Sequence, residues 1–112
     1  MLAEKLEIKK KIGDFNVDIR IGSNPPLVGK NGVEIEIWDA SAAAVLGAKV
    51  AIQYYMPPMP RMPPMNFKIE AKQKKGKYVA ALNLIMAGPW IVVLRIVVGE
   101  KTWSAKFSID VR

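Results

Sequence analysis

The last stretch of the chain, WSAKFSIDVR (residues 103–112), alternates without a break between apolar and polar residues. One parity carries the side chains of Trp103, Ala105, Phe107, Ile109 and Val111. The other carries Ser104, Lys106, Ser108, Asp110 and Arg112. Because successive side chains of a strand point to opposite faces, this period of two predicts a β-strand with one buried face and one solvated face.

The same pattern recurs upstream and sets the fold class. Apolar residues alternate or cluster in residues 6–12, 15–21, 33–37, 48–54, 67–71, 78–84 and 90–98. A chain of 112 residues, 51% of them hydrophobic and 24% charged, has the size and composition of one globular domain. We predict an all-β protein, an antiparallel β-sandwich of seven to eight strands. It forms a single domain over residues 1–112, in which residues 1–14 supply an N-terminal strand.

Turn-forming residues divide these strands. We expect Asn31-Gly32 to form a turn before a strand, residues 42–46 to form at most one helical turn, and residues 72–77 to form a hairpin tip. Because strand directions alternate, connections two apart in sequence leave the sandwich at the same end. We therefore expect the loops 22–30, 56–65 and 86–89 to share one end.

The residues from 91 to 98 are apolar on both parities apart from Arg95. A central strand covered on both faces has this pattern. A strand whose outer face exposes Ile91, Val93 and Val97 has it too, and such a patch would suggest a surface for a partner.

The charge pattern limits the classes of partner. The net charge is +7, but many lysines alternate with apolar residues as on a solvated strand face, and the dense cluster at 72–77 has no interleaved aromatic residues. A stacking platform for single-stranded nucleic acid is therefore not supported, and we expect no nucleic-acid partner. No run of about 20 apolar residues is present, so we expect no membrane span. No secretory signal is visible, which fits either a cytosolic protein or a mature exported chain.

The most unusual stretch is MPPMPRMPPM (residues 56–65), here called the methionine segment. Proline fixes φ near −65° and keeps the preceding residue out of the helical region, so the segment is expected to be largely polyproline II. That helix has about three residues per turn. Met56, Met59, Met62 and Met65 would therefore lie along one edge of a rod.

Thioether sulfur is neutral, soft and polarisable, and among biological metals it suits Cu(I) best, with Ag(I) as a chemical mimic. The chain has no histidine and no cysteine, which argues against a zinc site or a tight Cu(II) site. We therefore predict a Cu(I) site at the methionine segment. The alternative is that these adaptable side chains form a docking patch for a protein partner.

Geometry sets a condition on the metal site. A polyproline II rise of about 3.1 Å per residue separates neighbouring methionine backbones by roughly 9 Å. Three sulfurs on a straight rod cannot share one ion, so a three-sulfur site requires a bend, expected near Arg61-Met62, or a cis proline. The alternative is a contribution from Met86 in the adjacent loop. Trp90 would then lie over the ion as a cation–π cap.

Several motifs together resemble one protein family. "NPPLVGKNGVEIEIWD", "AKVAIQYYMPPMPRMPPM", "GKYVAALNLIMAGPWIVVLRIV" and the closing "FSIDV" are similar to the YtkA-like domain, which is related to FixH-like proteins. The resemblance covers residues 15–112. Its most specific parts are Pro26 with Gly29 and Asn31, the methionine segment, Gly76-x-Tyr78 and Gly88-x-Trp90.

The resemblance implies an immunoglobulin-like sandwich, periplasmic or otherwise extracytoplasmic, associated with copper efflux or with the assembly of copper oxidases. It places the metal ligands in the methionine segment. This segment departs from the family pattern in having no histidine, and the turn after Asp39 is longer and richer in alanine. The sequence thus predicts a non-enzymatic protein that holds or transfers Cu(I). The alternative is a non-enzymatic interaction module that docks a copper-efflux or oxidase-assembly protein.

Overall fold

Strands make up the regular structure of this protein. The computed structural model describes residues 6–22, 26–57, 60 and 65–112. In these residues the chain forms nine strands: β1 (Leu6–Ile12), β2 (Phe15–Ile21), β3 (Gly29–Trp38), β4 (Lys49–Tyr55), β5 (Asn66–Glu70), β6 (Lys72–Lys74), β7 (Lys77–Leu84), β8 (Gly88–Val98) and β9 (Lys101–Val111). The described part of the chain contains no helix long and apolar enough to cross a membrane.

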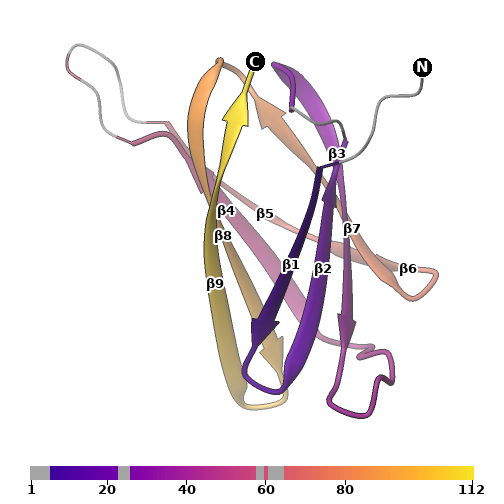
Figure 1. Cartoon of the computed structure of the whole chain (residues 1–112). Helices are drawn as coiled ribbons and strands as arrows, with labels where there is room; N and C mark the ends of the chain where they lie inside the picture. Colours follow the sequence, from indigo (N-terminus) through magenta and orange to yellow (C-terminus); the bar gives the residue numbers. More distant parts are fainter. Residues whose placement is uncertain (1–5, 23–25, 58–59, 61–64) are drawn as a thin grey trace.

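The strands form two antiparallel sheets, with the orders β1-β2-β3-β7-β6 and β5-β4-β8-β9 (Figure 1). The strands β2-β3-β7-β6 and β4-β8-β9 repeat the two sheets of the immunoglobulin arrangement, to which β1 and β5 are added at the edges. The predicted β-sandwich is therefore confirmed.

The count of nine strands exceeds the predicted seven to eight because the chain changes sheets at one residue. β5 pairs with β4 in one sheet, and β6 pairs with β7 in the other. Ala71 lies between them, and its N–H donates to the carbonyl oxygen of Val50 at 2.8 Å. The short β6 then closes the predicted hairpin through Lys75 and Gly76, whose φ angles of 52° and 79° suit a two-residue turn.

The core lies between the two sheets and consists of the apolar parity of each strand. In β9 the inward residues Ile109 and Val111 are buried, while the alternate positions are exposed, as the opening stretch predicts. The largest side chain of the core is Trp90, which is fully buried. Tyr78 is also buried, and its hydroxyl group donates to the carbonyl oxygen of Val45 at 2.8 Å. Most of the sandwich is thus held by burial of aliphatic and aromatic surface.

One local prediction is wrong. Asn31 and Gly32 lie inside β3, paired with Leu82 and Ala81 of β7, and form no turn. The side chain of Asn31 is buried and its amide donates to the carbonyl oxygens of Leu27 and Gly29, which gives this asparagine a role inside the strand. Pairing with β7 therefore overrides the local turn preference of the dipeptide.

Residues 42–46, which we expect to form at most one helical turn, form none. The Asp39 carboxylate instead accepts hydrogen bonds from the Ser41 N–H, the Ser41 hydroxyl and the Ala43 N–H. These bonds hold the pKa of Asp39 below its ordinary value, the Ser41 hydroxyl contributing most. An Asp side chain that binds nearby backbone groups offers the chain an alternative to helix, and here that alternative forms.

The expected grouping of loops at one end is confirmed where the chain is described. The Arg112 N–H donates to the carbonyl oxygen of Pro26, which lies in the 22–30 connection. Gly88, which begins β8, lies against the side chain of Met56. Figure 1 shows the C-terminus and the β7–β8 connection at the top, and the β1–β2 and β8–β9 turns at the bottom.

Candidate metal site

The two ends of the methionine segment are paired with each other. The β4–β5 ladder runs to Tyr55, which lies opposite Asn66. One step further, the Met56 N–H donates to the carbonyl oxygen of Met65 at 3.2 Å. A straight polyproline II rod of this length would separate its ends by roughly 28 Å. The segment therefore does not run straight from Met56 to Met65, because strand pairing on both sides brings its two ends together.

This reversal is the bend that a multi-sulfur site requires. Its position at Arg61-Met62, and the placement of Met59 and Met62, lie outside the described residues. Opposed residues of an antiparallel pair have Cβ atoms about 4.5–5.5 Å apart on the same face. Met56 and Met65 thus stand side by side, although nine residues separate them in the sequence.

Both methionines belong to the inner face of the sheet. The side chain of Met56 is 7% exposed and lies in the core, and Met65 is half-buried against it. Next to them on the same face, Tyr54 stacks on Phe67 with ring centroids 5.2 Å apart. The pair therefore adjoins an aromatic layer.

Trp90 completes this aromatic layer. Its ring centroid lies 5.8 Å from that of Tyr54 and 6.2 Å from that of Phe67. The indole is fully buried, and its N–H donates to the carbonyl oxygen of Met86 at 2.8 Å. Trp90 is thus a core residue that anchors the loop carrying Met86, and its action as a cation–π cap stays a prediction.

The connection that carries Met86 leads into Gly88, which lies against Met56. Gly88 has a φ of +127°, and a Cβ built on it would lie 2.9 Å from the Met56 methyl carbon. Met86, two residues earlier, is 36% exposed and is the most exposed of the three described methionines. The described thioethers of Met56, Met65 and Met86 therefore gather at one end of the sandwich.

The sulfur donors at this end are thioethers, and the Asp110 carboxylate lies opposite Pro89 on the outer face of the sheet. The chain contains no histidine or cysteine, and the described residues contain no group of three or more carboxylates that could hold a metal ion. Such a neutral and soft donor set suits Cu(I) or Ag(I), and offers little to Mg²⁺ or Ca²⁺.

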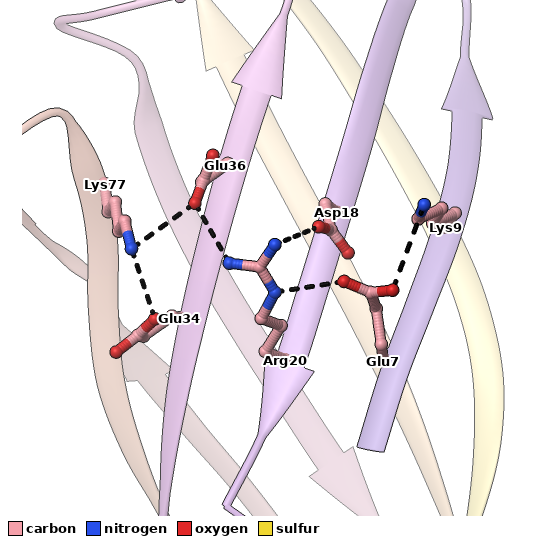
Figure 2. Close-up of polar contacts among 7 residues, drawn as sticks. All are labelled: Glu7, Lys9, Asp18, Arg20, Glu34, Glu36 and Lys77. Carbon is pink, nitrogen blue, oxygen red and sulfur yellow. Dashed lines mark hydrogen bonds and ion pairs between the residues drawn. The ribbon is translucent and has the colours of Figure 1, made fainter. Parts of the chain in front are cut away.

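A second cluster of side chains, which the sequence interpretation missed, lies on the outer face of the other sheet (Figure 2). The Arg20 guanidinium contacts Glu7 at 3.0 Å, Asp18 at 3.0 Å and Glu36 at 3.2 Å. These residues come from three neighbouring strands. The alternation of Asp18 with Arg20 marks them as a solvated face, but only the register reveals which charges meet.

This cluster shifts the pKa values of two carboxyl groups in opposite directions. Burial raises the pKa of Asp18, and the nearby Glu7 carboxyl group raises it further. A hydrogen bond from Arg20 lowers the pKa of Glu7. One oxygen of Asp18, Oδ1, has no hydrogen-bond partner among the described residues, and in Figure 2 the free oxygen of Asp18 points toward Glu7. The cluster is therefore an ion-pair network in which one carboxylate oxygen, Oδ1 of Asp18, lacks a hydrogen-bond donor.

Comparison with known proteins gives one match. The model of a family described as YtkA-like matches residues 9–95, which run from β1 into β8 and include the methionine segment, Met86 and Trp90. No curated protein and no solved structure matches the chain.

Proposed function

The chain belongs to the YtkA-like family, and from this membership and its paired methionines we propose that it is a non-enzymatic protein that holds or transfers Cu(I) through thioethers. Its proposed location, the periplasm or another extracytoplasmic space, follows from the family resemblance alone. The observation that carries the copper proposal is the hydrogen-bonded pairing of Met56 with Met65.

The pairing of Met56 with Met65 supports the proposal because it sets a short distance between the two side chains. Cβ atoms about 4.5–5.5 Å apart allow two flexible methionine side chains to bring their sulfurs together. Sulfurs that share one ion must lie within roughly 4 Å of each other if each metal–sulfur bond is about 2.3 Å. Met56 and Met65 meet the backbone condition for a two-sulfur site, which the straight rod did not.

A third sulfur would come from Met86, or from Met59 or Met62 in the part of the segment outside the described residues. Met86 is exposed and its backbone is fixed by Trp90. An exposed and exchangeable third ligand suits transfer of the ion better than permanent retention.

The absence of enzymatic activity is part of the proposal. The sequence contains no histidine or cysteine to act as base or nucleophile. Of the carboxylates, Asp18 and Glu7 are engaged by Arg20, and Asp39 caps its own turn.

Titration of the protein with Cu(I) against a competing chelator tests the proposal. Met56→Leu with Met65→Leu keeps the apolar volume nearly unchanged while removing both sulfurs, so the fold should persist. We expect this double variant to lose at least about tenfold in Cu(I) affinity, which corresponds to about 1.4 kcal/mol. Ile52→Leu with Ile69→Leu, a conservative change at another opposed pair of the same two strands that removes no sulfur, is the matched control. Equal affinity of the double variant and the wild type would refute the proposed site.

The alternative function, a module that docks a metal-efflux or oxidase-assembly protein, is favoured by a different observation. Among the described residues, most of the large exposed apolar side chains lie at the methionine end, namely Leu27, Val28, Ile85 and Met86. Gly29 at the start of β3 pairs with Leu84 at the end of β7, so these four side chains lie on the two connections that adjoin this pair of strand ends. Under this alternative, a defined partner would bind equally with and without copper, and replacing the methionines would abolish that binding.

A further inference from the structure

An aliphatic strip runs along the outer face of the β5-β4-β8-β9 sheet. Ile91, Val93 and Val97 of β8 are each half-buried, whereas Val92, Leu94 and Ile96 between them point into the core. The described residues contain no helix, and the other sheet covers only the inner face. Of the two interpretations that the sequence left open, a partly exposed strip is therefore the correct one.

Cations surround this aliphatic strip. Arg95 lies between Val93 and Val97 on the same face, and the register places Lys106 beside Val93 and Lys49 beside Val97. Lys68 follows on β5, opposite Gln53. All four cations are exposed, and none forms an ion pair among the residues that the structure describes.

The acidic residues of this face are fewer than its cations. Glu70 lies opposite Ala51 on the edge strand β5, and Asp110 lies opposite Pro89 at one end of β9. The face therefore combines an apolar centre with an excess of positive charge.

The face is also hollowed where the cations gather. A hollow of about 290 Å³ is lined by Lys49, Lys68, Arg95 and Val97, with Ala51, Val50, Ala71 and Glu70. A smaller one of about 20 Å³ adjoins it beside Val93 and Gln53. A carboxylate side chain placed in the larger hollow would meet three cationic groups and one carboxylate, that of Glu70, so positive charge predominates there.

The opposite outer face carries the ion-pair network. There, Arg20 contacts three carboxylates, and Lys77 lies 3.6 Å from Glu34 and 3.4 Å from Glu36 (Figure 2). Other cations of that face, Lys11 of β1 and Lys72 and Lys74 of β6, form no ion pair among the described residues. What distinguishes the outer face of β4, β5, β8 and β9 is that its unpaired cations surround an aliphatic strip and a hollow, and this combination points to a ligand that supplies both negative charge and apolar side chains.

We propose that the outer face of β4, β5, β8 and β9 binds an acidic protein segment that carries apolar side chains between its carboxylates. The apolar side chains would cover Ile91, Val93 and Val97, and the carboxylates would pair with Lys68 and Arg95. A second copy of this chain that docks through the same face does not fit, because its own cations would face these cations. Nucleic acid fits poorly because the strip is aliphatic and offers no row of aromatic faces for bases. This inference goes beyond the proposed copper function, since it uses a different surface and requires no metal.

A titration of the metal-free, isotope-labelled full chain with synthetic peptides tests this inference. Two peptides of about twelve residues would share the same leucine and valine positions and carry either glutamate or lysine at the others. We expect the glutamate peptide to bind at least about tenfold more tightly than the lysine peptide. It should shift the amide signals of Ile91, Val93 and Val97, and its binding should weaken as salt is raised from about 0.05 to 0.3 M.

Charge reversal supplies the matched control. Lys68→Glu with Arg95→Glu should weaken binding of the glutamate peptide at least about tenfold, and Lys72→Glu with Lys74→Glu, an equal change on exposed β6, should alter it by less than about twofold. The inference is overturned if neither peptide binds or if both peptides bind equally. It is also overturned if oligouridylate or phosphatidylserine vesicles displace the glutamate peptide from these residues and bind more tightly. Loss of Cu(I) binding in the methionine variants leaves this result unchanged, so the two proposals fail independently.

Discussion

Gly88 is the residue on which the geometry of the methionine end depends. Its φ of +127° is one that a residue with a side chain rarely adopts, and a Cβ there would lie 2.9 Å from the Met56 methyl carbon. We expect Gly88→Ala to lower the free energy of unfolding by about 1–3 kcal/mol, because the backbone would be strained in addition to the contact. Urea denaturation measures this loss.

Gly32→Ala is the matched control for this residue. Gly32 is also a strand glycine, but a methyl group added there would have no atom within 4 Å, and its backbone needs no positive φ. Its replacement should change the free energy of unfolding by less than about 0.5 kcal/mol. Similar losses from both substitutions would contradict the role assigned to Gly88.

At the scale of elements, the ion pairs across β1, β2 and β3 predict how stability depends on pH. The pKa of Asp18 is raised above 3.8, so the native state binds this proton more tightly than the unfolded chain does. The contribution of Asp18 is fully present below its unfolded pKa and is lost as pH rises through its native pKa. We therefore expect the stability of Asp18→Asn relative to the wild type to increase as pH rises from about 4 to 7.

Glu7→Gln should behave in the opposite way. The pKa of Glu7 is lowered below 4.5, so its contribution is present above that pH and is lost as pH falls through the native pKa. This variant should lose stability relative to the wild type as pH rises. Thermal unfolding across the pH range measures both trends, and parallel curves for the two variants would count against the network as described.

At the scale of the whole molecule, the β1–β2 turn closes the sandwich against the opposite sheet. The Trp103 ring of β9 meets Phe15 edge to face at 4.8 Å, and a Cβ on Gly13 would lie 2.6 Å from its ring nitrogen. Trp103→Ala should therefore cost about 2–4 kcal/mol, somewhat less than for a fully buried tryptophan. Trp38→Ala, at a half-buried position with no ring contact among the described residues, should cost clearly less. Equal losses in denaturant unfolding would show that Trp103 does not link the sheets.

Much of this fold could be predicted from local pattern. The period of two in residues 103–112 and its repeats gave the strand positions, because a strand that buries one face must alternate. The same alternation, with the loops between, gave the end at which Met56 and Gly88 meet. The prediction for Asn31-Gly32 failed because pairing with β7 outweighed the local turn preference of the dipeptide. Residues 42–46 form no helical turn because the Asp39 carboxylate binds the Ala43 N–H instead.

The sequence by itself determined the chemistry of this protein: the soft thioether donors, the absence of histidine and cysteine, and the all-β pattern, since these depend only on residue type and spacing. Tertiary structure alone decided which of those groups meet. It paired Met56 with Met65, buried Trp90 beneath the loop of Met86, and left cations unmatched around Ile91, Val93 and Val97. The physical reason is register, because the hydrogen-bonded alignment of distant strands sets every cross-strand neighbour and no local pattern records it.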